Sequence, residues 1–74
     1  MKKYEDYDQL DQMFFDEILE IIRKKYGGNP RNMMDSSTFF MRYEEDPLFI
    51  QHYPSVYWAD FIYDQHVNRS RLDA

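Results

Sequence analysis

The chain has 74 residues, a formal net charge of −5, no cysteine, and an aromatic-rich composition with seven tyrosines, six phenylalanines and one tryptophan. A chain of this length forms a single domain that buries only about 60% of the surface its unfolded form exposes. Without cysteine, neither a disulfide nor a cysteine-rich zinc site is available to stabilise it, so the large aromatic side chains must supply the buried area. We therefore expect one domain over residues 1–74, with residues 1–7 and 69–74 frayed.

The N-terminus has two lysines with no apolar segment behind them, so it does not have the form of a signal peptide. No stretch of the chain approaches the 18 or more apolar residues (about 20 for a full span) of a membrane helix. The absence of cysteine fits a reducing compartment. We expect a cytoplasmic protein with no membrane partner.

Residues 8–26 show a helical pattern. On a helical wheel, one half-circle collects the apolar and aromatic side chains, and the other half is polar except for Met13. Acidic residues crowd the first turns, and Arg23, Lys24 and Lys25 occupy the last one, as the helix dipole favours. A stripe this wide predicts a central helix that packs against more than one neighbour. Its members are Leu10, Phe14, Phe15, Ile18, Leu19, Ile21, Ile22 and Tyr26.

The segment 27–37, GGNPRNMMDSS, is the one evident loop. Its glycine pair suits the left-handed position that ends a helix, and Pro30 prevents the preceding helix from resuming. We expect Met33 and Met34 to fold back over the core, because methionine fills irregular gaps. The alternative is that this adaptable pair is exposed and binds a partner, so both residues are candidate contact residues.

Residues 36–45, SSTFFMRYEE, fit two patterns. The two phenylalanines and Tyr43 share a helical face, and Asp35 or Ser36 would cap such a helix, but TFFMRY also alternates as a strand does. We favour a helix, because no second strand is evident that could satisfy the backbone of the first.

Two boundaries marked by proline follow. Asp46 before Pro47 has the form of an N-cap with proline at the first helical position, which predicts a short helix over 47–53. The last helix begins at Ser55 and is expected to run to about Asn68. The fold class predicted from these elements is all-α, a small bundle of three to four short helices around a central N-terminal helix.

Catalytic chemistry has little support in the sequence. No glycine-rich elbow, phosphate loop or cofactor motif accompanies the polar side chains, so we expect no enzyme, no catalytic residue and no cofactor. Asp60 and Asp64 share a helical face, but His66 projects from nearly the opposite side, so a metal site is not predicted either. The groups weighed for these roles are His52, His66, Asp60, Asp64, Ser36, Ser37, Thr38 and Ser55.

Nucleic-acid binding is disfavoured because the net negative charge repels phosphates. A recognition helix presents Arg, Lys, Asn or Gln to the groove, whereas the last helix presents Asp60 and Asp64. The basic segment 23–31, together with Arg69 and Arg71, supports the main alternative, a small DNA-associated regulatory protein.

The last helix divides into two faces. Tyr57 and Phe61 lie one turn apart outside its apolar face, beside the Asp60 and Asp64 pair. Because like charges at this spacing repel each other mildly, the carboxylate pair suits an external cation, and the aromatic rings suit an anchoring role. The alternative is that Tyr57 and Phe61 pack beneath a neighbouring helix. The core face predicted for this helix is Val56, Trp58, Ala59, Ile62, Tyr63, His66 and Val67.

These patterns predict an acidic module that binds a basic protein through Tyr57, Phe61, Asp60 and Asp64. Inhibitors, immunity factors, antitoxin-like neutralisers and phage-type regulators act by such binding, and a prokaryotic or phage origin would suit so short a chain. A third interpretation is self-association, as a homodimer or a larger assembly, through the same two aromatic side chains, Tyr57 and Phe61.

Overall fold

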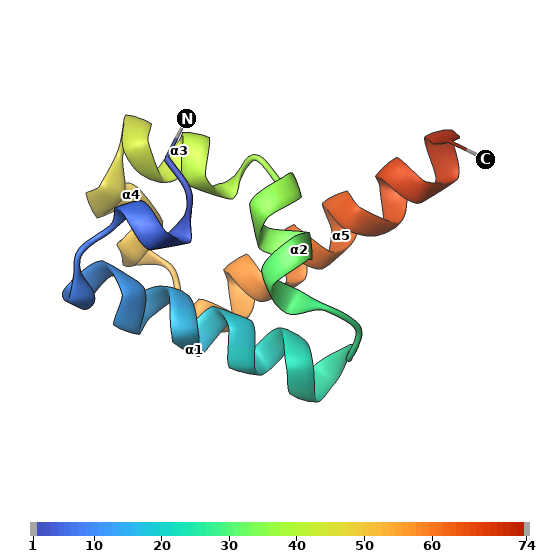
Figure 1. Ribbon diagram of the computed structural model, residues 1–74, viewed down its shortest axis with the longest axis horizontal. Helices are drawn as coiled ribbons and strands as arrows, with labels where there is room; N and C mark the ends of the chain where they lie inside the picture. Colours follow the sequence, from blue (N-terminus) through green and yellow to red (C-terminus); the bar gives the residue numbers. More distant parts are fainter. Residues whose placement is uncertain (1, 74) are drawn as a thin grey trace.

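The computed structural model describes residues 2–73, and within this range every regular element is a helix. The helices form an irregular bundle in which α1 runs along one side and the C-terminal end of α5 leads away from the body (Figure 1). The all-α prediction is confirmed. The elements are a 3₁₀ helix, η1 (Tyr4–Asp6), and the α-helices α1 (Gln9–Lys25), α2 (Pro30–Ser36), α3 (Phe39–Glu45), α4 (Pro47–His52) and α5 (Ser55–Asp73).

The predicted count of three to four helices is wrong, because residues 30–36 form α2 instead of a loop. The side chain of Asn29 accepts a hydrogen bond from the backbone N–H of Asn32, and Pro30 occupies the first turn. We interpreted Pro30 only as the stop signal of the preceding helix, although proline is equally suited to begin the next one. The two glycines before Asn29 lie at positive φ, 77° and 74°, and make the tight connection.

The N-terminal helix, which we expected to be central, runs along one side of the bundle, although it packs against more than one neighbour as its wide apolar stripe predicted (Figure 1). Asp8 caps α1 by accepting from the Asp11 N–H, and the helix packs against both α2 and α5. Leu10, however, is 78% exposed, so its assignment to the core stripe is wrong. The reason is the position of α5, whose first residue, Ser55, hydrogen-bonds to Glu17, so that α5 lies against the later turns of α1. The fully buried residues of α1 are Phe15, Ile18 and Ile22.

An aromatic cluster fills the core where η1, α1 and α3 meet. The Tyr7 ring lies 5.0 Å from Phe15 and 5.5 Å from Phe40, and Phe15 lies 5.0 Å from Tyr43. These rings bury large areas in edge-to-face and offset arrangements that aromatic pairs favour. The segment before α1, which we expected to fray, therefore packs against the core through Tyr7.

Residues 39–45 form the helix we favoured over a strand, but its start differs from the prediction. The helix begins after Thr38, and neither Asp35 nor Ser36 caps it. Instead Gln65 of α5 accepts from the Thr38 backbone N–H at 2.8 Å and donates to the Thr38 hydroxyl at 2.8 Å. A residue distant in the sequence therefore supplies the partner of this helix start, which local capping rules do not anticipate.

The short helix after Asp46 is confirmed, since the Asp46 carboxylate accepts from the Phe49 N–H at 3.1 Å. The last helix is longer than expected and continues to Asp73 instead of ending near Asn68. Residues 69–73, which we expected to fray, are assigned to this helix, and residue 74 lies outside the described residues. Within residues 2–73, no helix is both long enough and apolar enough to cross a bilayer.

Candidate protein-binding surface

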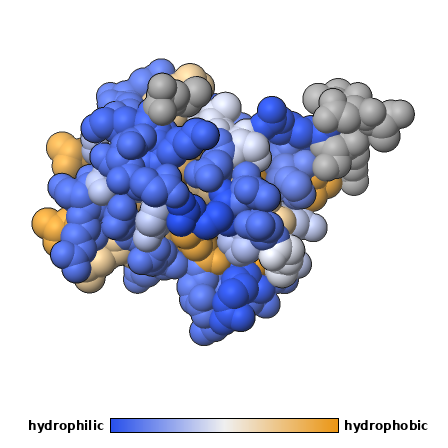
Figure 2. Space-filling model, viewed as in Figure 1, coloured by the Kyte–Doolittle hydropathy of each residue, from blue (hydrophilic) through white to orange (hydrophobic). Residues whose placement is uncertain are grey.

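Exposed apolar side chains concentrate in one part of this fold. Of the eight large hydrophobic side chains exposed among residues 2–69, all but Met41 come from residues 10–13 and 48–57. Figure 2 shows hydrophobic residues at the left edge of the molecule, where Figure 1 places α4 and the N-terminal end of α1. We call this set the apolar surface. Its members are Leu10 (78% exposed), Met13 (59%), Leu48 (81%), Phe49 (52%), Tyr53 (37%), Val56 (43%) and Tyr57 (48%).

The shortness of α4 leaves its apolar residues outside the core. Only Ile50 of this six-residue helix is buried, because one short helix can turn a single side towards the core. The indole N–H of Trp58 donates to the Ile50 carbonyl at 2.6 Å, and this buried hydrogen bond ties α4 to α5. Leu48 and Phe49 are consequently held in fixed positions on the outside of the molecule.

Three exposed rings continue from α4 into α5, and we call them the aromatic ladder: Phe49, Tyr53 and Tyr57. The Phe49 and Tyr53 centroids lie 5.3 Å apart, and the Tyr53 and Tyr57 rings stack at 4.9 Å with an interplanar angle of 23°. Tyr57 in turn packs edge-on against the buried Trp58 at 4.8 Å. The ladder therefore rests on the core, and ordering it for a partner costs little additional side-chain entropy.

The α1 part of the apolar surface approaches the start of α5. Leu10, Met13 and Glu17 follow one another at helical spacing and so share one side of α1. The Ser55 hydroxyl donates to the Glu17 carboxylate at 3.1 Å. Because Ser55 directly precedes Val56 and Tyr57, the α1 stripe leads to the edge of the aromatic ladder.

The charged side chains that accompany the apolar surface in the sequence are all acidic. Residues 4–22 and 43–68, which supply all of it, contain no lysine or arginine. Asp46 lies at the α4 end of the ladder, Glu17 lies beside Ser55, and Asp64 lies two turns after Tyr57 on the same side of α5. The acidic residues of the two stretches are Glu5, Asp6, Asp8, Asp11, Asp16, Glu17, Glu20, Glu44, Glu45, Asp46, Asp60 and Asp64.

The structure places the four contact residues that we predicted on the last helix, Tyr57, Phe61, Asp60 and Asp64, in different surroundings. Tyr57 is exposed, but Phe61 is half-buried, with its ring 5.4 Å from Trp58 and the Arg42 guanidinium 5.2 Å from its centroid. Phe61 thus packs against the neighbouring α3, which is the alternative we left open for it. Asp64 is exposed and forms no ion pair with the described residues.

The cation that we expected from outside for Asp60 comes from within the domain. Lys25 donates to the Asp60 carboxylate at 2.8 Å, and the Tyr26 hydroxyl donates to the same oxygen at 2.6 Å. These two hydrogen bonds, that of Lys25 foremost, hold the pKa of Asp60 below its usual range. Asp60 therefore binds α5 to the end of α1, and it is not an unpaired carboxylate awaiting a partner.

The remaining candidate residues lie elsewhere. Met33 (7% exposed) and Met34 (0%) are buried, so they fill the core and do not contribute to an exposed contact surface. His66 and Val56 are exposed and do not join the core face of α5, because its buried part is narrow and consists of Trp58, Ala59 and Ile62. Among residues 2–69, whose side chains the structure describes, no three His, Asp or Glu side chains are grouped so that they could hold a metal ion.

Most basic side chains of the described chain have acidic partners within it. Arg23 binds Glu20 at 2.6 Å, Lys25 binds Asp60 and Arg31 binds Glu5. The basic segment 23–31, on which the DNA-associated alternative depends, is therefore occupied in the folded domain. Phosphate contacts would have to replace these pairs, which reduces the net gain from each contact.

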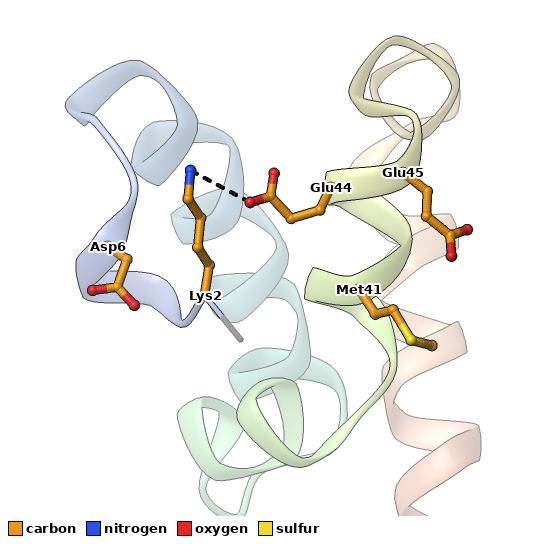
Figure 3. A pocket seen from close by; sticks show the side chains of 5 residues that line it. All are labelled: Lys2, Asp6, Met41, Glu44 and Glu45. Atoms are coloured by element: carbon orange, nitrogen blue, oxygen red, sulfur yellow. Dashed lines mark ion pairs between the residues drawn. The ribbon is translucent and has the colours of Figure 1, made fainter.

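A groove of about 670 Å³ opens between the N-terminal segment and α3 (Figure 3). Lys2 and Glu44 face each other across it and form an ion pair at 3.3 Å, whereas the carboxylates of Asp6 and Glu45 point away from that pair (Figure 3). The acidic groups do not converge on one point, so this groove offers no site for a cation.

A second groove, of about 600 Å³, lies between the α2–α3 turn and α5. Its polar groups already serve the fold: Gln65 forms both of its hydrogen bonds with Thr38, and Arg69 donates to the Ser36 carbonyl. Neither groove matches the apolar surface in exposed hydrophobic character, so the apolar surface is the stronger candidate for a functional site.

Comparison with protein-family models, with curated proteins and with solved structures finds no match to this chain.

Proposed function

We propose that this protein is a small acidic binding module whose partner is a basic protein docked on the apolar surface. The observation that carries the proposal is the concentration of exposed large hydrophobic side chains beside carboxylates, in stretches free of lysine and arginine. A small domain rarely leaves so many large apolar side chains in water in one part of its fold unless a partner covers them. Tyrosine and phenylalanine are effective anchors at such interfaces, because they bury much area at little entropic cost.

The proposed mode of action is neutralisation of the partner by binding, as an inhibitor, immunity factor, antitoxin or phage-type regulator does. The carboxylates around the ladder would steer a basic partner during approach, and the aromatic rings would hold it after contact. We place this activity in the cytoplasm, where a protein without disulfides needs no oxidising environment.

Self-association is the second candidate, because a second copy would also cover the apolar surface. A symmetric dimer would bring the ladder of one copy against that of the other, together with the carboxylates at both ends. With no lysine or arginine in residues 43–68, these like charges would repel. Sedimentation at low salt tests self-association directly. A monomer at tens of micromolar would rule it out, and a dimer would favour it.

The test of the proposal compares three immobilised baits in extracts of the source cell: wild type, Tyr57→Ala with Leu48→Ser, and Met41→Ala. Met41 is 44% exposed but lies outside the apolar surface, so its variant is the matched control. Proteins retained by wild type and Met41→Ala but lost from the double variant are identified, purified and measured by calorimetry. A basic protein bound with salt-sensitive affinity would support the proposal. Equal retention by all three baits would contradict it.

A further inference from the structure

We infer that the partner occupies the aromatic ladder with a basic amphipathic helix, and this inference rests on the proposed function. The ladder has a spacing, a surrounding charge and a neighbouring set of internal contacts that each point to this occupant.

The ring spacing matches the repeat of a helix. Successive centroids of Phe49, Tyr53 and Tyr57 lie 5.3 Å and 4.9 Å apart, close to the pitch of an α-helix, about 5.4 Å. A helix lying along the ladder therefore brings one side chain of each turn, at positions i, i+4 and i+7, against successive rings. An extended chain repeats its side chains on one face every 6.4–6.8 Å or so, and it would drift out of register.

The fold also offers no backbone to an extended partner. Strand addition needs a free sheet edge, and the described residues contain no strand. The backbone N–H groups at the start of α4 are partly satisfied by Asp46, and Trp58 binds the Ile50 carbonyl at its end. Recognition at this surface must rely on side chains, which is how a helix is recognised.

The charge around the ladder requires basic residues at the edges of the docking helix. Asp46 lies at one end of the ladder and Asp64 lies beyond the other end. Glu17 lies beside Ser55, at the edge of the ladder. Asp64 has no ion-pair partner among the described residues, so it is available to a cation. A helix with leucine-like residues on one face and arginine or lysine flanking them complements both features.

The domain holds its own cations by the same combination of a ring and a carboxylate. The Lys25 ammonium lies 5.4 Å from the Tyr26 ring centroid and 2.8 Å from the Asp60 carboxylate. Arg31 lies 3.9 Å from the Tyr4 centroid and pairs with Glu5. At the ladder, Tyr57 and Asp64 lie two turns apart on α5, so cations two turns apart on the docking helix would contact the ring and the carboxylate separately.

The experiment uses the full-length protein and synthetic helical peptides of about 18 residues. The first peptide has leucine on one face and arginine at the flanks of that face. The second has glutamate in place of each arginine. The third is the first peptide with its central residue replaced by proline, which breaks the helix. Binding is followed by calorimetry and by the emission of Trp58, the only tryptophan, whose ring contacts Tyr57 at 4.8 Å. We expect the arginine peptide to bind and the other two to bind at least tenfold more weakly.

Variants locate the site on the protein. Tyr57→Ala and Asp64→Lys should each weaken the arginine peptide about tenfold, whereas the controls Met41→Ala and Asp35→Lys should leave its affinity unchanged. Asp35 is exposed on α2, so its variant alters the net charge by the same amount as Asp64→Lys at a different place. Thermal melts confirm that each variant folds, and Tyr53→Ala replaces Tyr57→Ala if the latter does not.

Two results overturn the inference in different ways. Equal binding of the proline peptide, or of the glutamate peptide, would show that helicity or positive charge is not recognised. If no peptide binds, while the captured basic protein binds wild type and does not bind Tyr57→Ala, the helical occupant is overturned and the proposed function still stands. A captured protein insensitive to every ladder variant would overturn the proposed function itself.

Discussion

Two tyrosines in the same aromatic cluster should respond in opposite directions when their hydroxyl groups are removed. The Tyr43 hydroxyl donates to the Asp11 carboxylate at 2.5 Å and accepts from the Gln51 side chain at 2.6 Å. It thereby joins α1, α3 and α4. The Tyr7 hydroxyl is buried and has no hydrogen-bond partner within the described residues, although its ring lies only 5.6 Å from that of Tyr43. The two Tyr→Phe substitutions therefore test the polar contacts while leaving the packing of the rings in place.

The expected magnitudes follow from the hydrogen bonds. A hydrogen bond to a charged group contributes about 1.5–3 kcal/mol, and Asp11 is partly exposed, so Tyr43→Phe should cost about 1.5 kcal/mol. For a domain of this size that corresponds to a fall in Tm of about 6–12 °C. Burying an unsatisfied hydroxyl costs about 1–3 kcal/mol in proteins, so Tyr7→Phe should leave the free energy of unfolding unchanged or raise it.

The assay is thermal unfolding followed by circular dichroism at 222 nm, with urea unfolding as a second measure of stability. We expect a lower Tm for Tyr43→Phe and an equal or higher Tm for Tyr7→Phe. A fall in Tm of Tyr7→Phe as large as that of Tyr43→Phe would refute the reasoning, because it would mean that the Tyr7 hydroxyl has a partner that stabilises the fold.

Three other predictions concern stability. Burial, followed by the charges of nearby carboxylates, raises the pKa of Tyr7 to about 12. Because this pKa lies above the ordinary value of 10, the contribution of Tyr7 to stability is complete below pH 10 and is lost as the pH rises towards 12. Tyrosinate absorbance and circular dichroism can follow this loss together, and a loss of stability that begins near pH 8 would contradict the prediction. Gly27→Ala and Gly28→Ala should each destabilise by about 1 kcal/mol because of their positive φ. The Cβ added at Gly28 would lie 2.8 Å from Met33 Cε, the end of a flexible side chain that can shift, so the two variants should have similar urea midpoints. A much lower midpoint for Gly28→Ala would show that Met33 cannot shift. Asn29→Ala should cost about 1 kcal/mol by removing the cap of α2, and an unchanged urea midpoint would show that this cap contributes nothing.

Much of the fold follows from local sequence signals. The apolar stripe of α1 and its Asp8 cap, and the Asp46 cap with Pro47 that starts α4, are features that single helices display in sequence. The all-α class follows from them. The α2 helix was missed because Pro30 and the glycine pair before Asn29 were interpreted only as helix breakers, although Asn29 before proline is itself a helix-start signal.

The other errors arise from tertiary contacts that no local pattern specifies. The start of α3 depends on Gln65, and the cation bound to Asp60 is Lys25, 35 residues away in the chain. Leu10 belongs to the apolar stripe of α1, yet α5 lies too far along that helix to cover it. Wheel patterns state which side chains share a side of a helix, but they do not state how much of that side a neighbour covers.

The candidate site was found only in part. Tyr57 and Asp64 were identified from the α5 pattern, while Phe49, Tyr53 and Leu48 were missed. A signal for them was present: the short helix after Pro47 has three consecutive apolar residues, and successive residues lie about 100° apart around a helix, so they cannot all face one core. At least one of the three had to be exposed.

The most direct test of the account is an amide chemical-shift map of the labelled protein, recorded as its captured basic partner is added. We expect the largest changes to fall in residues 10–13 and 48–57, to extend to Asp64, and to be absent from Tyr57→Ala at the same partner concentration. Changes concentrated instead in the basic segment 23–31, with residues 48–57 unaffected, would contradict the assignment of the apolar surface as the binding site.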